Sequence, residues 1–194
     1  MGRAVVISGT PGTGKTVIAK KLALKLNGVY INLNDLALSN NLCLYYDEER
    51  NSCVIDEDGV KDLAERVIKQ CREYCIVDSH YGEIISGSLI EKIFVLRLHP
   101  RELMLRLIRR GWSKSKVREN VEAELLAVCT SNALNQHPKD KVCEIDVTGR
   151  APNAVVNDIV GILKGVAKCV VGVDWLEEVD AVLINKLLNV GNPN

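Results

Sequence analysis

The stretch Gly9-Thr-Pro-Gly-Thr-Gly-Lys-Thr16, directly behind the apolar run Ala4-Val5-Val6-Ile7, decides the fold of this chain. It fits the pattern G-x-x-x-x-G-K-[ST], in which a strand leads through a glycine-rich loop into a helix. Gly9, Gly12 and Gly14 carry no side chain that could keep phosphate oxygens away from the backbone N–H groups. The stretch therefore predicts a site for the phosphates of a nucleotide.

Two side chains at the end of this loop supply chemistry. Lys15 can reach the β- and γ-phosphates, and the hydroxyl of Thr16 can ligate Mg²⁺. The helix that begins here adds its positive N-terminal end, which favours an anion. We expect nucleotide contacts from Gly9, Gly12, Thr13, Gly14, Lys15 and Thr16.

A glycine-rich turn without a ligand is the alternative interpretation of this loop. The segment after it is amphipathic, with Val17, Ile18, Leu22 and Leu26 on one face, as a helix in this motif requires. The strand before the loop and the helix after it therefore favour the nucleotide site.

Charge is balanced over the whole chain but unevenly distributed. The 194 residues carry no formal net charge, so no overall field recruits nucleic acid or a membrane, and we find no nucleic-acid motif. Six of the eleven arginines lie within residues 97–118, and we expect this stretch to attract phosphate. We expect an acidic segment to attract a basic partner; it holds Asp47, Glu48, Glu49, Asp56, Glu57 and Asp58 against Arg50 alone.

The apolar segments and the cysteines indicate the compartment. The first apolar run is short and leads straight into the loop, and no apolar stretch approaches the roughly 20 residues of a membrane span. The seven cysteines form no C-x-x-C pair and most have apolar neighbours, which predicts buried free thiols. Cys71 and Cys75 lack a second pair of metal ligands. We expect a soluble, cytoplasmic protein in a reducing compartment.

Strand-like and helix-like segments alternate along the chain. Runs typical of strands occur at residues 4–7, 29–33, 74–78, 93–98 and 142–147. Helical patterns occur at residues 14–26, 60–72, 101–109, 115–134 and 153–169, with Pro100 suited to the first helical position. This alternation predicts an α/β fold, a P-loop NTPase with a parallel β-sheet flanked by helices. A further amphipathic helix is predicted after residue 172, from Trp175, Val179, Val182, Leu183 and Leu187.

A carboxylate and an imidazole follow the third predicted strand. The run Cys75-Ile76-Val77-Asp78 places Asp78 at a carboxyl end, the edge where ligands of open α/β sheets bind. We expect Asp78 to hold the Mg²⁺ shell, with an ordinary strand-to-loop aspartate as the alternative. We expect His80 to orient a water or a phosphate or to relay a proton, with a plain surface histidine as the alternative.

The sequence Arg109-Arg110-Gly111-Trp112 separates two amphipathic segments. An arginine at the base of a mobile flap could neutralise a transferring phosphoryl group, and we assign this role first to Arg110. Arg109 and Arg118 are weaker candidates, since Arg118 could instead pair with Glu122 at i,i+4.

Taken together, these features resemble one family: the atypical adenylate kinases of archaea and the eukaryotic nucleus (isoenzyme six), which also act as ATPases in maturation of the small ribosomal subunit and its rRNA. The resemblance covers roughly residues 3–165. Besides the loop, the matching pieces are residues 31–37 (Ile-Asn-Leu-Asn-Asp-Leu-Ala), 46–49 (Tyr-Asp-Glu-Glu), 55–58 (Ile-Asp-Glu-Asp), 77–80 (Val-Asp-Ser-His), 95–97 (Val-Leu-Arg), 110–113 (Arg-Gly-Trp-Ser) and 119–124 (Glu-Asn-Val-Glu-Ala-Glu).

The resemblance implies a kinase domain over residues 1–172 and an extension over residues 173–194. Within the domain it implies an NMP-binding segment at about residues 33–55 and a short lid at about residues 109–119. It implies ATP held by the loop and Arg110, with Mg²⁺ beside Thr16 and Asp78. Val17 stands where the family often has threonine, and it would contact ATP through its backbone N–H.

Two functions are compatible with these residues. The first is a broad-specificity nucleoside monophosphate kinase, ATP + AMP ⇌ 2 ADP, with ATPase activity and Lys15, Asp78, His80 and Arg110 as catalytic residues. Residues 33–58 offer only Arg50 for the phosphate of AMP. The second is an ATPase-driven assembly factor whose partner, by resemblance, is the small-subunit ribosomal protein S11 and whose docking surface is the acidic segment. A kinase acting on an unrelated small molecule is a third, more distant alternative.

Overall fold

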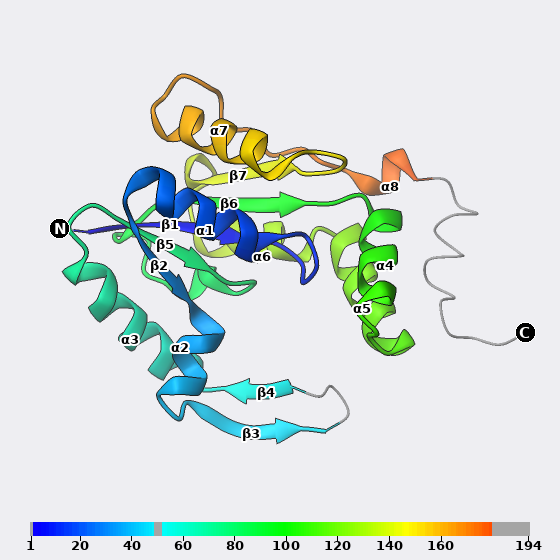
Figure 1. The fold of residues 1–194 in the computed structure, drawn as a ribbon, viewed down its shortest axis with the longest axis horizontal. Coiled ribbons are helices and arrows are strands. Elements are labelled where there is room, and N and C mark those ends of the chain that lie inside the picture. The colour runs from blue at the N-terminus through cyan, green and yellow to red at the C-terminus, as the bar shows by residue number, and fades with distance from the viewer. Residues whose placement is uncertain (1, 49–51, 180–194) are drawn as a thin grey trace, which may run out of the picture.

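A five-stranded, entirely parallel sheet forms the centre of the computed structural model, which describes residues 2–48 and 52–179. Its order is β2-β5-β1-β6-β7 (Figure 1). The strands are β1 (Arg3–Ser8), β2 (Val29–Asn32), β5 (Tyr74–Asp78), β6 (Ile90–Arg97) and β7 (Val142–Asp146). These are the five strands that the apolar runs predict, so the α/β fold with a parallel sheet is confirmed.

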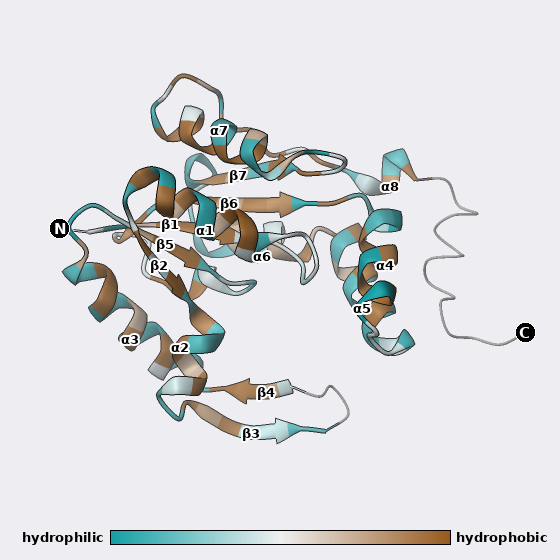
Figure 2. Ribbon diagram, in the orientation of Figure 1, coloured by the Kyte–Doolittle hydropathy of each residue, from teal (hydrophilic) through white to brown (hydrophobic). Residues whose placement is uncertain are grey.

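Helices cover both faces of the sheet. Successive strand residues point to opposite sides, so a strand of consecutive apolar residues must be buried on both faces. In β1, Val5 and Ile7 join one hydrophobic cluster while Ala4 and Val6 join the other, and all four are fully buried. Figure 2 shows the matching hydrophobic colour along the central strands. Helices α1 (Lys15–Leu26) and α7 (Pro152–Leu163) cover the first face, and α3 (Glu57–Gln70) and α6 (Val128–Gln136) cover the second.

A helix pair lies beyond the carboxyl end of β6 (Figure 1). It consists of α4 (Pro100–Arg109), which begins at the proline predicted for its first position, and α5 (Lys114–Leu125). The single helix predicted over residues 115–134 is wrong, because Ala127 has a φ of 51° and separates α5 from α6. Likewise α7 ends at Leu163 rather than at residue 169, just before Gly165 with its φ of 71°.

Between β2 and α3 the chain forms elements that the hydrophobic pattern does not predict. They are helix α2 (Leu33–Ser39) and an antiparallel hairpin of β3 (Cys43–Asp47) and β4 (Ser52–Ile55), which projects from the sheet (Figure 1). Leu44, Tyr45 and Tyr46 are 64%, 62% and 56% exposed, so β3 has no buried face whose alternation could reveal it. The predicted NMP-binding segment falls on these elements, while Glu49 and Arg50 lie outside the described residues.

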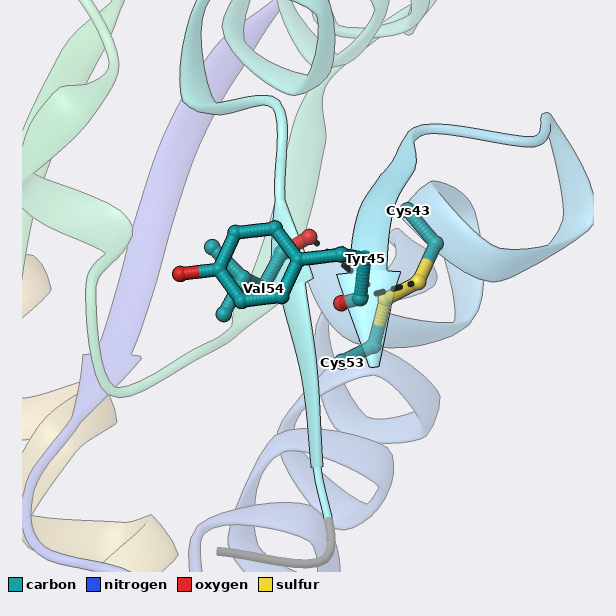
Figure 3. Close-up of a disulfide and its surroundings, with 4 residues drawn as sticks. All are labelled: Cys43, Tyr45, Cys53 and Val54. Atoms are coloured by element: carbon teal, nitrogen blue, oxygen red, sulfur yellow. Dashed lines mark hydrogen bonds between the residues drawn. A yellow bond between two sulfur atoms is a disulfide. The ribbon is translucent and has the colours of Figure 1, made fainter. Parts of the chain in front are cut away.

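The cysteines correct the prediction of free thiols. Disulfides join Cys43 to Cys53, Cys71 to Cys75 and Cys143 to Cys169, and Cys129 alone among the seven is free. Figure 3 shows the first of these, which links β3 to β4. Pairing depends on Cα atoms lying within about 7 Å of each other, and here they are 5.8, 6.2 and 5.1 Å apart. Apolar neighbours in the sequence predict burial but not that proximity.

The described residues of the predicted C-terminal extension, 173–179, pack against the first hydrophobic cluster. It contains the short helix α8 (Trp175–Glu178), with Trp175 and Val179 buried. Val182, Leu183 and Leu187 lie outside the described residues. Two 3₁₀ turns complete the fold, η1 (Gly82–Ile84) and η2 (Lys139–Lys141). Within the described residues, no helix combines the length and the apolar character needed to cross a bilayer.

The disulfides predict the number of reactive thiols. Protein purified and denatured without reductant should expose one thiol to Ellman's reagent, that of Cys129, and seven after reduction. The variant Cys129→Ser is the control and should expose none before reduction. Seven reactive thiols without reductant would instead restore the prediction of free cysteines.

Candidate active site

The glycine-rich loop joins β1 to α1 at the carboxyl edge of the sheet. Gly9, Gly12 and Gly14 have φ values of 131°, 104° and 105°, which L side chains rarely adopt. A Cβ on Gly9 would lie 2.5 Å from the carbonyl oxygen of Leu96, and one on Gly12 would lie 2.7 Å from a methyl group of Leu103. The backbone conformation therefore favours glycine at all three positions, and at Gly9 the neighbouring backbone carbonyl excludes a side chain as well.

Lys15 lies folded over the loop. Its Nζ donates to the carbonyl oxygens of Gly9 at 2.6 Å and Thr10 at 3.2 Å. Burial lowers the pKa of Lys15 from its usual value, while the nearby carboxylates of Asp78 and Glu124 act in the opposite direction. The amine lines a pocket of about 580 Å³ above the loop, where an anion would offer it a stronger partner than two carbonyl groups.

Asp78 lies at the carboxyl end of β5 and is 2% exposed. One of its oxygens, Oδ2, accepts hydrogen bonds from Thr16 Oγ1 at 2.7 Å, Tyr30 OH at 2.8 Å and Asn32 Nδ2 at 3.0 Å. Burial and the hydrogen bond to Asp78 raise the pKa of Tyr30 to about 12, so the phenol remains a neutral donor. These three donors hold the carboxylate in one orientation.

Tyr30 and Asn32 are not among the predicted site residues, although the sequence carries a signal for Asn32. Asn32 is a polar residue at the end of β2, and the parallel register places it beside Asp78. Parallel strands bring their carboxyl ends to one edge of the sheet. The signal for Asn32 is therefore its position at the end of a predicted strand. The contact of Tyr30 with Asp78 depends on β2 being the neighbour of β5, which the sequence pattern does not predict.

The pair Thr16 and Asp78 fits a magnesium ion. Both side chains offer oxygen ligands, and Thr16 Oγ1 lies 2.7 Å from Asp78 Oδ2 at the pocket. Mg²⁺ prefers oxygen ligands and usually binds through one or two protein groups together with phosphates and water. Among residues 2–48 and 52–179 no cluster of three or more His, Cys, Asp or Glu could hold a metal on its own.

His80 lines the same pocket and also borders a neighbouring one. The side chain is exposed, but the protein around the pocket still removes part of its hydration. This loss of water, together with the charge of Lys15, lowers the pKa of His80 to about 4, against the opposing effect of Asp78. The imidazole is therefore neutral near pH 7 and can donate one hydrogen bond and accept another.

The arginine-rich stretch does not form one basic surface. Arg110 lines the pocket above the loop, whereas Arg118 pairs with Glu122 at 2.7 Å, the alternative that the sequence left open. Arg109 is exposed and lies outside the lining of that pocket. Arg97 contradicts the expectation for this stretch, because it is 1% exposed and pairs with buried carboxylates.

Arg106 lies beside the loop as well, although it is not among the predicted site residues. One of its terminal nitrogens lies 3.4 Å from the carbonyl oxygen of Gly12, and the other pairs with Glu102 at 2.6 Å. Its signal was present in the sequence, because Arg106 stands one helical turn before Arg110 and i,i+4 neighbours share a face. Together they line a second pocket of about 260 Å³ beside α1.

Two further pockets adjoin the central one, and the second of the three is also lined by the loop. The second pocket combines arginines with apolar side chains, among them Val17, Ile18 and Val155. A third pocket of about 420 Å³ lies on the other side, between α2, β4 and His80. Its lining includes Asn34, Leu38, Val54, Ile55, Glu57 and Tyr81. The arrangement offers one central place for phosphate groups and a partly apolar place on each side.

Comparison with known proteins finds relatives over most of the chain. The family described as "AAA domain" matches residues 5–127. The "Putative adenylate kinase" of Saccharolobus solfataricus is 38% identical over 172 residues, which are 89% of this chain and 87% of that protein. The protein of the same name from Pyrococcus furiosus is 38% identical over 181 residues, covering 92% and 94%.

Solved structures share the fold at low sequence identity. A gluconokinase from Sinorhizobium meliloti 1021 superposes with a TM-score of 0.57 at 14% identity, covering 85% of this chain and 93% of that chain. A shikimate kinase from Bacteroides thetaiotaomicron reaches 0.54 at 16% identity, covering 84% and 99%. These likenesses concern the arrangement of the sheet and its helices.

The environment of His80 predicts its titration in the nucleotide-free protein. Since its pKa is lowered to about 4, the neutral imidazole should persist as the pH falls well past the ordinary midpoint of about 6.5. An NMR titration of the imidazole C–H signals from about pH 8 to about pH 4 tests this, and the signal missing from His80→Gln identifies the residue. A midpoint between about pH 6 and 7 for that signal would contradict the prediction.

Proposed function

We propose that this chain transfers the γ-phosphoryl group of ATP to AMP and forms two ADP. It belongs to the AAA domain family and to the family of the archaeal proteins named "Putative adenylate kinase". Homology and the kinase fold support a nucleotide kinase. The observation that carries the proposal is the central pocket, where Lys15, Arg110 and the pair Thr16 and Asp78 converge between two flanking pockets.

The donor nucleotide would place its phosphates over the glycine-rich loop. The backbone N–H groups of residues 12–17 and the N-terminal end of α1 favour anionic oxygens there. Lys15 would exchange the carbonyl oxygens of Gly9 and Thr10 for the β- and γ-phosphates. The second pocket would take the base, with apolar contacts from Val17 and Val155 and with Arg106 and Arg110 at its edge.

The metal position depends on an oriented carboxylate. Mg²⁺ between Thr16 and Asp78 would bridge phosphate oxygens and neutralise part of their charge. Tyr30 and Asn32 keep Asp78 turned toward Thr16 through their hydrogen bonds to Oδ2. Outer partners of this kind commonly tune metal affinity by holding the ligand in place.

Transfer then requires the acceptor phosphate in line with the donor, since catalysis of this reaction is mainly positioning and charge neutralisation. The third pocket is the acceptor site in this proposal, and His80 lies where it meets the central pocket. A neutral imidazole can orient a phosphate oxygen without adding charge. The proposed lid at residues 109–119 would cover the phosphates, since Trp112, Lys116 and Glu119 already line the central pocket.

The choice of AMP as acceptor rests on the relatives more than on the pocket. Within the described residues, the third pocket is lined by Glu57 and by no arginine. A phosphate would therefore meet its cations at the boundary with the central pocket, near Lys15 and Arg110. This geometry suits an acceptor that reaches inward with its phosphate and leaves its base against Leu38 and Ile55.

Product analysis tests the proposed reaction. With Mg-ATP and AMP, ADP should accumulate at twice the molar rate of AMP loss, because each transfer makes two ADP. Lys15→Ala should lower the rate at least 100-fold, by roughly 3 kcal/mol of barrier, with unchanged circular dichroism as the control for folding. ATP loss matched by inorganic phosphate, with AMP untouched, would favour an ATPase instead.

A second candidate function is an ATP-driven assembly factor for the small ribosomal subunit, with ribosomal protein S11 as its basic partner. The observation that favours it is the exposure of Leu44 and Tyr45 on the hairpin, together with that of the carboxylates Glu48, which follows β3, and Asp58, in the first turn of α3. Exposed apolar side chains bordered by charge are typical of protein-binding surfaces. Asp56 has a local role as well, because it caps α3 through the N–H of Gly59 at 3.1 Å.

Neutralising these two exposed carboxylates tests the second function. Glu48→Gln combined with Asp58→Asn should weaken binding of ribosomal protein S11 several-fold in a calorimetric titration, most strongly at low salt where exposed charges are least screened. Asp56 is left intact because it caps α3, and Glu57 is left intact because it lines the proposed acceptor pocket. The matched control is Glu177→Gln with Glu178→Gln on α8, and equal affinity for both double variants would contradict the docking role.

A further inference from the structure

Three charged side chains are buried behind the loop and have no part in the proposed transfer. Arg97, Glu124 and Glu144 are 1%, 1% and 8% exposed. They come from three elements, since Arg97 ends β6, Glu124 lies in the last turn of α5 and Glu144 lies in β7. Charges removed from water to this extent are costly unless every polar atom finds a partner.

Glu124 joins four parts of the fold through its carboxylate. Oε2 accepts from the hydroxyl of Thr10, in the glycine-rich loop, at 2.5 Å. Oε1 accepts from Arg97 Nε at 2.8 Å, from Trp175 Nε1 at 3.0 Å and from the N–H of Leu98 at 3.1 Å. The loop, β6, α5 and α8 therefore meet at one side chain.

The rest of the cluster ties down the chain that leads to Trp175. Glu144 Oε2 accepts from the N–H groups of Gly172 and Val173 at 2.7 and 2.8 Å. Arg97 bonds to Glu144 Oε1 and to the carbonyl oxygen of Val173. The segment before α8 is thereby held against β7, and the indole of Trp175 reaches Glu124.

Thr10 connects the buried cluster to the glycine-rich loop. Its carbonyl oxygen accepts from the N–H of Thr13 at 3.2 Å, from the Thr13 hydroxyl at 2.9 Å and from Lys15 Nζ at 3.2 Å. The side chain of Thr10 is anchored to Glu124 while its backbone organises the loop. Fixing a loop before its ligand arrives removes the entropic cost of ordering it on binding.

We propose that Glu124 is a positioning residue, which holds the glycine-rich loop in its nucleotide-binding conformation through Thr10. Trp175 contributes by holding the carboxylate of Glu124 in place through its indole N–H. The proposal rests on the proposed binding of ATP at the loop. It also gives residues 172–175 a role in the site, although they lie far from the glycine-rich loop in the sequence.

A matched pair of hydroxyl deletions separates this role from plain stabilisation. Thr10 and Thr130 are both buried, and each donates to a carboxylate of the cluster, at 2.5 Å to Glu124 and at 2.6 Å to Glu144. Thr10→Val and Thr130→Val should lower the thermal midpoint by similar amounts, on the order of 3–6 °C. Only Thr10→Val should weaken binding of ATP in a calorimetric titration, by roughly tenfold, and Thr10→Ser should restore it.

The outcomes of this titration are distinct. Equal loss of ATP affinity in both valine variants, or none in Thr10→Val, would overturn the positioning role. Unchanged affinity in Thr10→Val with normal ATP binding by the wild type would leave the kinase proposal standing and remove this inference alone. A wild-type chain that binds no ATP would overturn both.

A second variant tests the part played by the C-terminal segment. Trp175→Phe keeps an aromatic ring beside His99, whose ring centroid lies 5.5 Å away, and removes the N–H that reaches Glu124 together with the five-membered ring that carries it. ATP affinity should fall by roughly threefold. The double variant Thr10→Val with Trp175→Phe should lose less than the product of the single losses, because both act through one carboxylate. A strictly multiplicative loss would show that Trp175 acts independently of the loop.

Discussion

The parallel pairing of β1 between β5 and β6 is the constraint on which the rest of the site depends. It places the glycine-rich loop at the centre of the carboxyl edge, with Ile7 beside Asp78, and the pairing of β5 with β2 sets Asn32 on the other side of Asp78. From there the contact of Thr16 with Asp78 follows, because α1 starts directly above that strand end. Residues 4–7 of β1 are apolar on both faces of the sheet and fully buried, so both faces must be covered by helices.

Buried carboxylates serve this fold in two different ways. The donors to Asp78 are a hydroxyl, a phenol and an amide, all uncharged, so the carboxylate keeps its charge available for a cation at the pocket. Glu124 instead bonds directly to a buried guanidinium, that of Arg97. A carboxylate neutralised by a fixed cation contributes orientation and packing, whereas one held by neutral donors at an open pocket can contribute binding. The same chemical group therefore supports the site in one place and forms it in the other.

The arginines between residues 97 and 118 show why a cluster of charge in the sequence is not a cluster in space. Arg97 points into the core, Arg118 bonds to its neighbour Glu122, and Arg106 and Arg110 face the pockets from one side of α4 and its C-terminal end. The helical period distributes neighbouring side chains around the axis. Of these four arginines, only Arg106 and Arg110, one turn apart, line the pockets beside the loop.

Features that depend on near neighbours in the chain were determined by the sequence alone: the glycine-rich loop, the five strands, their alternation with helices and the start of α4 at Pro100. Apolar periodicity and special backbone conformations encode these locally. Only the tertiary structure decided which distant residues meet, as in the contacts of Tyr30 with Asp78 and of Thr10 with Glu124, which lie 48 and 114 positions apart. It also decided the hairpin after α2, the break at Ala127 and the three cysteine pairings. The reason is physical: these contacts follow from strand order and helix packing, which bring segments together only when the whole chain has folded.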